Sequence, residues 1–340
     1  MTTNISRRGT LALLGGGLLA TQPGWAAPQR VATGRLVEGQ SPMAATLPHT
    51  RYFEIESRLA GARYAVWVAT PPLYEREPTR RYPAIYMPDG NSTAPVTIPR
   101  SRLLRSDPIA PIEPFIHVCV GYAGEDAPRL LAVRARDLLP PGEPLPGDIA
   151  ALRAGMAATV QIGMLDQAGA DLYLRYLQNP AGDRFLAFLV EELHPLLARE
   201  FRIADDGHGF WGYSYGGLFA TYLAMRRTPV FKRIGVGSPG ILPKLSKVFG
   251  LYEENLKTGK DFSGRSLHMT VNEREITAPT TYAPLVGAGT TEFITLAGSR
   301  PLSGLKFTSR IVAHESHATG GEASWFSFLR SAYAAGSTGG

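Results

Sequence analysis

A serine flanked by glycines lies where an apolar segment meets a segment typical of a helix. Residues 208–225 read HGFWGYSYGGLFATYLAM, which places Ser214 between Gly212 and Gly216. A serine hydroxyl is a poor nucleophile, so it must project from a sharp turn where a histidine can reach it, and glycines avoid collisions in that turn. A helix N-terminus behind the serine points backbone N–H groups at negative charge developing on an attacked carbonyl. The segment predicts Ser214 as a nucleophile; the alternative is a buried serine in a tight turn.

Three histidines follow this serine in the chain and are candidates for the base. In folds that display a serine in this way, the partners come in the order serine, acid, histidine. His268 lies inside the apolar run LHMTV, which favours a core or sheet-face position. His314 and His317 both lie just past the last expected strand. His317 is further into the loop and freer to reach across the sheet edge, so it is the predicted base and His314 the predicted loop histidine.

The acid should follow the run SLHMTVN, where Glu273 and Glu275 are both available. Such an acid accepts the proton-bearing nitrogen of the histidine and stabilises the imidazolium, and position alone leaves the choice between the two open. A second donor for the oxyanion should come from the loop after the third strand, Met87–Asn91, where Gly90 permits a close backbone approach.

These residues need a framework, and the rest of the chain supplies the pattern of one. Short β-branched and aromatic runs alternate with helical stretches, which predicts an α/β fold with a mostly parallel central sheet and helices on both faces. The expected strands cover residues 52–59, 63–69, 82–87, 115–121, 208–213, 232–237, 266–272 and 307–313. The clearest helices cover residues 183–199, 215–226 and 320–335.

Two stretches interrupt this alternation. Residues 139–181 begin with the breaker cluster LPPGEPLPGD and continue with a helical pattern, and residues 241–262 form a polar, lysine-bearing segment. We expect both to be insertions over the carboxyl edge of the sheet, where ligands bind in such folds. With no internal repeat, residues 50–335 are predicted to form one catalytic domain.

The N-terminus has the parts of an export signal. Arg7 and Arg8 follow a serine, the weakly apolar run 11–20 comes next, and small residues precede Pro28. Paired arginines are typical of the twin-arginine route, so residues 1–26 are predicted to be a cleaved signal peptide handled by that export machinery. Residues 27–49 would be a linker, and the mature protein would be periplasmic or secreted.

Composition excludes several other classes of function. The formal charge of +6 falls to +4 without the two arginines of the signal, and no basic run is interleaved with aromatics, so nucleic acid is not an expected partner. The single cysteine, Cys119, lies in an apolar run, which excludes an internal disulfide and disfavours a zinc site. No segment after residue 30 approaches the roughly 20 apolar residues of a membrane span. The sequence carries no signal for an oligomeric state.

From about residue 50 to 335 the chain resembles the putative-esterase family of α/β-hydrolases, which includes siderophore esterases that cleave ferric enterobactin- and bacillibactin-type trilactones. The resemblance is carried, in order, by FEIESRLAGARYAVWVATPP, YPAIYMPDGN, VGYAGED, RARDLLPP, DRFLAFLVEELHPLLAREFRI, WGYSYGGLFA, FKRIGVGSPG and HESHATGG. The family's Gly-x-Ser-x-Gly-Gly motif falls on residues 212–217, and its Asp-Gly-Asn motif falls on residues 89–91. The family's acid matches Glu275 rather than Glu273, and its base matches His317.

The resemblance implies an exported carboxylic-ester hydrolase that works through an acyl-enzyme, without a metal or organic cofactor. Ser214, His317 and Glu275 would form the triad, and the N–H groups of Tyr215, Gly90 and Asn91 would hold the oxyanion. The implied substrate is a hydroxamate- or catecholate-type siderophore ester. The alternatives are an acyl-sugar or feruloyl-type esterase, and a non-catalytic hydrolase-like binding protein.

Two arginines extend this expectation to the substrate. Arg134 and Arg136 follow the fourth expected strand, in a segment like the family's Arg-x-x-Asp, and a guanidinium there could pair with anionic catecholate oxygens. The alternative is that both are solvated or paired with Asp137. Near the same region Gly240 and Ile241 stand where the family often has a serine and an aromatic, which bears on the substrate rather than on the catalytic residues.

Overall fold

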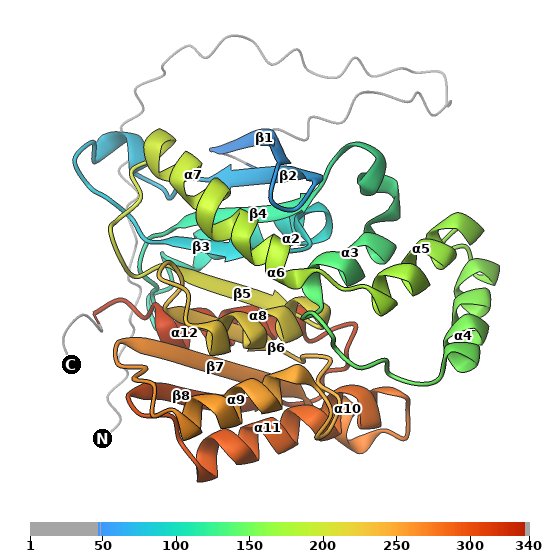
Figure 1. The fold of residues 1–340 in the computed structure, drawn as a ribbon. Helices are drawn as coiled ribbons and strands as arrows, with labels where there is room; N and C mark the ends of the chain where they lie inside the picture. Colours follow the sequence, from blue (N-terminus) through green and yellow to red (C-terminus); the bar gives the residue numbers. More distant parts are fainter. Residues whose placement is uncertain (1–46, 48, 337–340) are drawn as a thin grey trace, which may run out of the picture. The chain divides into compact units, whose positions relative to one another are not determined.

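The protein is described by a computed structural model that covers residue 47 and residues 49–336. Its centre is an eight-stranded sheet in the order β1-β2-β4-β3-β5-β6-β7-β8, in which β2 is antiparallel to both of its neighbours, β1 and β4, and all other neighbouring strands are parallel (Figure 1). The strands are β1 (Thr50–Ser57), β2 (Ala62–Ala69), β3 (Ala84–Met87), β4 (Ile116–Tyr122), β5 (Gly209–Tyr213), β6 (Arg233–Gly237), β7 (Arg265–Asn272) and β8 (Leu305–Val312). All eight expected strands are therefore present, with ends shifted by no more than a few residues.

Helices cover both faces of the sheet, because its central strands are apolar on both sides. On one face α2 (Gly90–Leu104) and α12 (Gly321–Ala332) pack with the sheet residues Met87, Cys119 and Trp211. The larger core lies on the other face, under α3 (Leu130–Leu138), α6 (Gly182–Ala187), α7 (His194–Glu200), α8 (Tyr215–Arg226), α9 (Lys247–Lys257) and α11 (Ala288–Ser299) (Figure 1). The predicted fold, a mostly parallel sheet with helices on both faces, is confirmed.

The expected helix over residues 183–199 is one helical segment with an irregular centre. It runs through α6 and α7, and the π-helical turn Phe188–Leu193 joins them. Phe185, Phe188 and Leu189 are all buried, which is the apolar stripe that the sequence indicated.

The insertion at 139–181 forms a helical cap. It contains α4 (Ile149–Gln161) and α5 (Gln167–Gln178), and α5 packs against α3 and α4. Each cap helix begins at an aspartate whose side chain accepts a first-turn N–H: Asp148 from Ala151 and Asp166 from Gly169. No residue of α4 is buried, so this helix is held mainly by its contact with α5.

The second expected insertion, residues 241–262, is different from the prediction. Its helix α9 packs against α8, with Val248 and Tyr252 fully buried one turn apart, and so belongs to the layer that covers the sheet. Only Leu242 of this segment reaches the pocket at the carboxyl edge. The apolar side chains of α9 lie at helical spacing between charged residues, and they pack this face of the helix against the core.

The remaining expectations concern the chain ends and the cysteine. The predicted signal peptide, residues 1–26, and nearly all of the predicted linker, residues 27–49, lie outside the described residues. Within the described part of the chain no helix is long and apolar enough to cross a membrane. Cys119 is fully buried in β4.

Candidate active site

Ser214 occupies a strained turn between β5 and α8. β5 ends at Tyr213, α8 begins at Tyr215, and Ser214 between them has a φ of 58° and a ψ of −120°. A non-glycine residue with positive φ costs free energy that the surrounding structure must offset, and such residues gather at functional sites. A Cβ at Gly212 would lie 2.0 Å from the carbonyl oxygen of Gly216, so the turn closes only because residue 212 is glycine.

His317 connects this serine to Glu275. The Nε2 atom of His317 lies 2.9 Å from the Ser214 Oγ, and its Nδ1 lies 2.6 Å from the Glu275 Oε1. Because a carboxylate can only accept, Nδ1 carries the proton and Nε2 is free to take the proton of the serine hydroxyl. The structure thus brings the three predicted residues into a continuous hydrogen-bonded chain.

The surroundings of Glu275 keep it charged although it is 1% exposed. Its Oε2 accepts hydrogen bonds from the Ser238 hydroxyl at 2.7 Å and the Asn272 backbone N–H at 2.8 Å, and its Oε1 accepts from the Asn272 side-chain amide at 3.0 Å. Burial by itself would raise the pKa of this carboxyl, but the hydrogen bonds from His317, Ser238 and Asn272 outweigh burial and lower the pKa. A charged carboxylate is the form that can orient and stabilise an imidazolium.

Ser238 and Asn272 were not among the predicted site residues. Asn272 is the N-cap of the short helix α10 (Glu273–Thr277), and with Glu275 it forms a reciprocal capping box. The spacing Asn-x-x-Glu after a strand is a recognisable capping signal that could have favoured Glu275 over Glu273. No comparable local pattern marks Ser238, which lies 37 residues before Glu275 in the chain.

Glu273 and His314 form a separate pair at the surface. The Glu273 Oε2 accepts the His314 backbone N–H at 2.6 Å and lies 3.6 Å from the His314 Nδ1. The His314 side chain is 88% exposed, whereas that of His317 is 13% exposed. Neither Glu273 nor His314 is hydrogen-bonded to Ser214, so the structure separates the alternatives that sequence position left open.

Two tyrosines hold the His317 segment in place. The Tyr213 hydroxyl donates to the backbone carbonyl of His317 at 2.8 Å and accepts the Asn272 side-chain amide at 2.7 Å. The ring of Tyr282 stacks on the imidazole, with ring centroids 4.3 Å apart and an interplanar angle of 17°. Tyr282 was also not predicted, because it comes from the loop after α10 and meets His317 only in the folded chain.

The predicted oxyanion donors stand at two helix starts. Tyr215 is the first residue of α8, and Gly90 and Asn91 are the first residues of α2, so the N–H groups of all three lack partners within their helices. The Asn91 side chain is engaged with the backbone of Tyr122, which leaves only its backbone N–H for a ligand. A Cβ at Gly216 would lie 3.0 Å from the Pro88 side chain, which shows that this loop abuts the serine turn.

Arg134 lies in the site but is already paired. Its guanidinium donates to both carboxylate oxygens of Asp89, Nε to Oδ1 at 3.0 Å and Nη2 to Oδ2 at 2.8 Å. It also lies over the ring of Tyr215, 5.3 Å from the centroid. Arg134 lines the pocket that contains Ser214, so it can still contact a ligand there.

Arg136 is placed differently from the substrate-binding role expected for it. It forms a bidentate pair with the buried Asp137 and a third bond to Asp126, and it does not line the pocket that contains Ser214. The Tyr64 hydroxyl also donates to Asp137, so the cluster joins β2 to α3. The structure therefore has the alternative in which Arg136 pairs with Asp137. The physical reason is that α3 directs residue 134 toward the pocket wall and residue 136 away from it.

The pocket around Ser214 has a volume of about 680 Å³, enough for a small organic substrate. The cap supplies most of its wall as apolar side chains, and these include Leu152, Met156, Leu165 and Leu177. Its charged lining residues are Arg134 and Glu143, besides the titratable His317. Burial raises the pKa of Glu143, which accepts hydrogen bonds from the Ser246 hydroxyl and the Lys247 backbone N–H.

Within residues 49–336, no group of three or more His, Cys, Asp or Glu side chains is arranged to hold a metal ion.

Known proteins resemble this chain in sequence and in fold. A family model described as putative esterase matches residues 153–283. The ferri-bacillibactin esterase BesA of Bacillus subtilis (strain 168) is 25% identical over 207 residues, which are 60% of this chain and 62% of BesA, so the match spans less than two thirds of that relative.

Two solved structures share the fold. The BES protein from Bacillus cereus has a TM-score of 0.65 and 22% identity, with 87% of this chain and 98% of that chain covered. Siderophore hydrolase EstA from Aspergillus nidulans has a TM-score of 0.65 and 17% identity, with 88% and 99% covered. The chain therefore has the fold of these hydrolase structures, and over residues 153–283 its sequence is similar to the putative esterase family.

Proposed function

We propose that this protein hydrolyses carboxylic esters through an acyl-enzyme formed on Ser214. The observation that carries the proposal is the hydrogen-bonded chain from Ser214 through His317 to Glu275, at 2.9 Å and 2.6 Å, inside a pocket of about 680 Å³. A serine, a histidine and a charged acid at these distances are the arrangement that acyl transfer needs.

In the first half of the reaction, His317 Nε2 removes the Ser214 proton while Oγ bonds to the ester carbonyl carbon. The carbonyl electron pair moves to oxygen, and the N–H groups of Tyr215 and of the loop 89–91 stabilise that oxyanion. The intermediate then collapses: the bond to the alcohol oxygen breaks, and His317 returns its proton to that oxygen. Glu275 stabilises the imidazolium while it exists.

In the second half, water replaces the alcohol. His317 takes a proton from the water as its oxygen bonds to the acyl carbon, and the second intermediate releases Ser214 with its proton restored. The products are a carboxylic acid and an alcohol. Turnover of a chromogenic short-chain ester by the purified protein would exclude the alternative, a non-catalytic hydrolase-like binding protein.

For the natural substrate we propose a siderophore ester. Relatives named as a ferri-bacillibactin esterase and a siderophore hydrolase support this class. Arg134 supports an anionic ligand, because its guanidinium lines the pocket beside the serine turn.

A second candidate substrate is an uncharged aryl or feruloyl-type ester. The observation that favours it is the apolar cap wall, where Leu152, Met156 and Leu165 could enclose an aromatic or alkyl acyl group.

The experiment compares kcat/KM for a ferric hydroxamate ester, a ferric catecholate trilactone and an uncharged aryl ester. The proposal expects measurable cleavage of the siderophore esters, with Arg134→Ala lowering catecholate cleavage more than aryl-ester cleavage, by roughly tenfold for one lost charge-assisted hydrogen bond. Arg136→Ala is the matched control and should leave the ratio between substrates unchanged. Aryl-ester turnover without any siderophore cleavage would favour the second candidate.

We also propose that the protein acts outside the cytoplasm. The support is Arg7 and Arg8 before a weakly apolar run, all outside the described residues. N-terminal sequencing of the active protein from cell fractions should find Ala27 in the periplasmic or secreted fraction, and replacement of both arginines by lysine should retain the protein in the cytoplasm. Active protein that begins at Met1 would exclude this localisation.

A further inference from the structure

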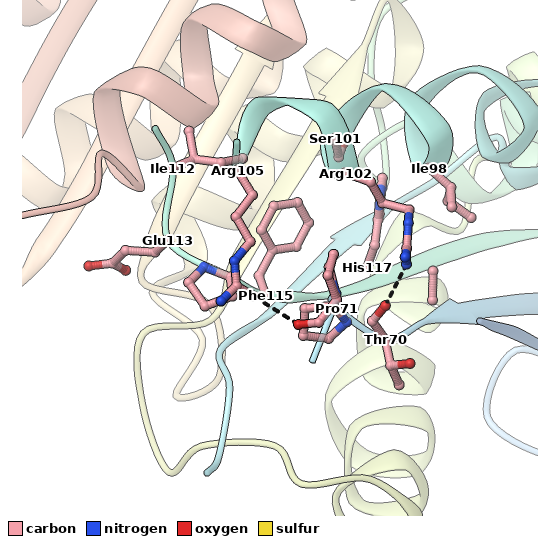
Figure 2. A pocket seen from close by; sticks show the side chains of 13 residues that line it. Thr70, Pro71, Ile98, Ser101, Arg102, Arg105, Ile112, Glu113, Phe115 and His117 are labelled. Carbon is pink, nitrogen blue, oxygen red and sulfur yellow. Dashed lines mark hydrogen bonds between the residues drawn. The ribbon is translucent and has the colours of Figure 1, made fainter. Parts of the chain in front are cut away.

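A second hollow lies at the amino end of β4, under the last turns of α2. Figure 2 shows the Arg102 and Arg105 side chains reaching from α2 toward the segment 70–72 that follows β2. His117, near the start of β4, lines this hollow, and Tyr122 ends the same strand beside the active-site loop. Five residue steps along the strand separate the two, roughly 16 Å at about 3.3 Å per step, and no residue lines both this hollow and the catalytic pocket.

The two arginines in this hollow lack an acidic partner. Arg102 donates one hydrogen bond to the carbonyl of Thr70 at 3.2 Å, and Arg105 donates one to the carbonyl of Pro72 at 2.9 Å. Neither guanidinium has a carboxylate within ion-pair distance among the described residues. Each guanidinium carries five N–H donors, so most of their donors are still available.

The acids nearest to these arginines are already engaged. Glu113 lines the hollow but pairs with Arg233 at 3.4 Å. Glu77, whose pKa is lowered mainly by its hydrogen bond from Tyr82 and also by the charges of Arg80 and Arg105, accepts hydrogen bonds from Arg80 and Tyr82. Burial lowers the pKa of Arg102, as expected for a half-buried cation that no carboxylate compensates. The hollow therefore contains two guanidinium groups that have no carboxylate within ion-pair distance among the described residues.

His117 is a second, independent sign of a missing ligand. Its side chain is 3% exposed, and both ring nitrogens are buried without a hydrogen-bond partner. The ring stacks on Trp325, with centroids 5.3 Å apart and an angle of 25°, which fixes its position. A neutral imidazole has one N–H donor, and a buried donor without an acceptor costs free energy.

We propose that this hollow binds a small carboxylate. The carboxylate oxygens would accept N–H groups of Arg102 and Arg105 and the ring N–H of His117, and a short apolar tail would contact Ile98 and Phe115. The hollow is open to solvent on one side, and its space of about 30 Å³ holds about two waters, which is the size of a carboxylate head group. Planar guanidinium forks match carboxylate geometry, and the apolar walls exclude a fully hydrated inorganic anion.

The test is a calorimetric titration of the full mature protein with acetate in buffer free of other carboxylates. Because acetate could also enter the catalytic pocket, the protein is first blocked at Ser214 with a fluorophosphonate. If labelling fails, the untreated protein is used, and only the acetate binding that changes in the arginine variants is assigned to the hollow. The proposal expects one saturable site, weakened at least about tenfold in Arg102→Gln and in Arg105→Gln. Arg100→Gln is the matched control, because Arg100 is on the same helix, does not line the hollow, and should bind acetate as the wild type does.

Ester turnover and the thermal midpoint of each variant show whether it is folded, and two arginine variants keep the test valid if one fails to fold. Absence of saturable acetate binding up to about 50 mM would overturn the site, as would equal affinity in all four proteins. Binding of inorganic phosphate without binding of acetate would overturn the carboxylate assignment. None of these outcomes depends on whether the protein cleaves siderophore esters.

Discussion

Glu275 shows how a single buried carboxylate is kept charged beside the nucleophile. Three donors from two residues hold it: the Ser238 hydroxyl, the Asn272 amide and the Asn272 backbone N–H. They leave the His317 Nδ1 proton as the remaining contact of the Glu275 side chain. Glu275 is therefore fixed in one orientation before any substrate binds, which is what preorganisation requires of a residue that stabilises developing charge.

The first prediction compares the two glutamates. Glu275→Gln should lower kcat by roughly a hundredfold to ten-thousandfold, because the amide can present N–H to Nδ1 and favour the wrong tautomer of His317. Glu273→Gln should change kcat less than about threefold, because Glu273 bonds only His314. Steady-state kinetics on an aryl ester at pH 8 measures both. Equal, small losses would show that the enzyme works as a Ser–His pair.

The second prediction concerns stability at acid pH. The folded-state pKa of Glu275 is lowered, so its charged form contributes stability above the unfolded pKa of about 4.3, and this contribution is lost as pH falls through the folded pKa. Urea unfolding of the wild type and Glu275→Gln at pH 6, 5, 4 and 3 should therefore show a difference in unfolding free energy that shrinks toward pH 3. A difference that grows on acidification would contradict the lowered pKa.

At the residue scale, sequence patterns were most informative where a residue's neighbours in the chain carry the function. Ser214 was recognisable because its strand, glycines and helix are contiguous. Arg134 and Asp89 are 45 residues apart, and their pairing appears only when α3 meets the loop after β3. The same limit explains Ser238 and Tyr282, whose roles depend on side chains from other elements.

At the scale of elements, the serine turn depends on glycines whose Cβ positions are occupied by backbone. The third prediction is that Gly212→Ala abolishes activity and folding to soluble protein, because its Cβ would lie 2.0 Å from the Gly216 carbonyl oxygen. Gly240→Ala is the matched control: it is close to the same turn, but its Cβ would meet only the Tyr215 ring at 3.6 Å. Expression yield and aryl-ester activity report both, and an active Gly212→Ala protein would contradict the described turn.

The fourth prediction concerns the attachment of the cap. The hydroxyls of Tyr173 in α5 and Tyr215 in α8 are hydrogen-bonded to each other, which ties the cap to the residue after the nucleophile. Tyr173→Phe should lower the free energy of unfolding by about 1 kcal/mol, the net value of one hydrogen bond. Tyr176→Phe, on the same helix but facing Arg136, should change it by less than about 0.5 kcal/mol. Urea denaturation checks both, and equal effects would show that the tie contributes nothing.

The periodicity of apolar residues predicted most helices and strands, but it did not predict where each of them packs. The stripe in residues 183–199 and the run 215–226 were clear because apolar residues recur at helical spacing. Residues 241–262 were expected over the carboxyl edge because this polar, lysine-bearing segment interrupts the alternation of strands and helices, yet Val248 and Tyr252 are buried and Phe249, Leu251 and Leu256 also pack α9 against the core. The apolar side chains at helical spacing, and not the charged residues between them, decide where α9 packs.

For the whole molecule, the parallel sheet explains why the chemistry gathers at one edge. Ser214 follows β5, Glu275 follows β7, His317 follows β8, and the loop 89–91 follows β3. The carboxyl ends of parallel strands meet at one edge of a sheet, so residues far apart in the chain converge there. The sequence could predict this convergence, because it needs only the strands and their order. It could not predict how the cap packs over the pocket or that a hollow lies under α2, because both depend on packing between segments that are far apart in the chain.

The fifth prediction tests the central claim, that Ser214 is the nucleophile of an ester hydrolase. The purified protein is incubated with a fluorophosphonate and examined by intact mass and peptide mapping. The expected result is one covalent adduct per chain, located on Ser214, formed in step with the loss of esterase activity and absent in Ser214→Ala. Loss of activity without an adduct on Ser214, or full ester hydrolysis by Ser214→Ala, would contradict it.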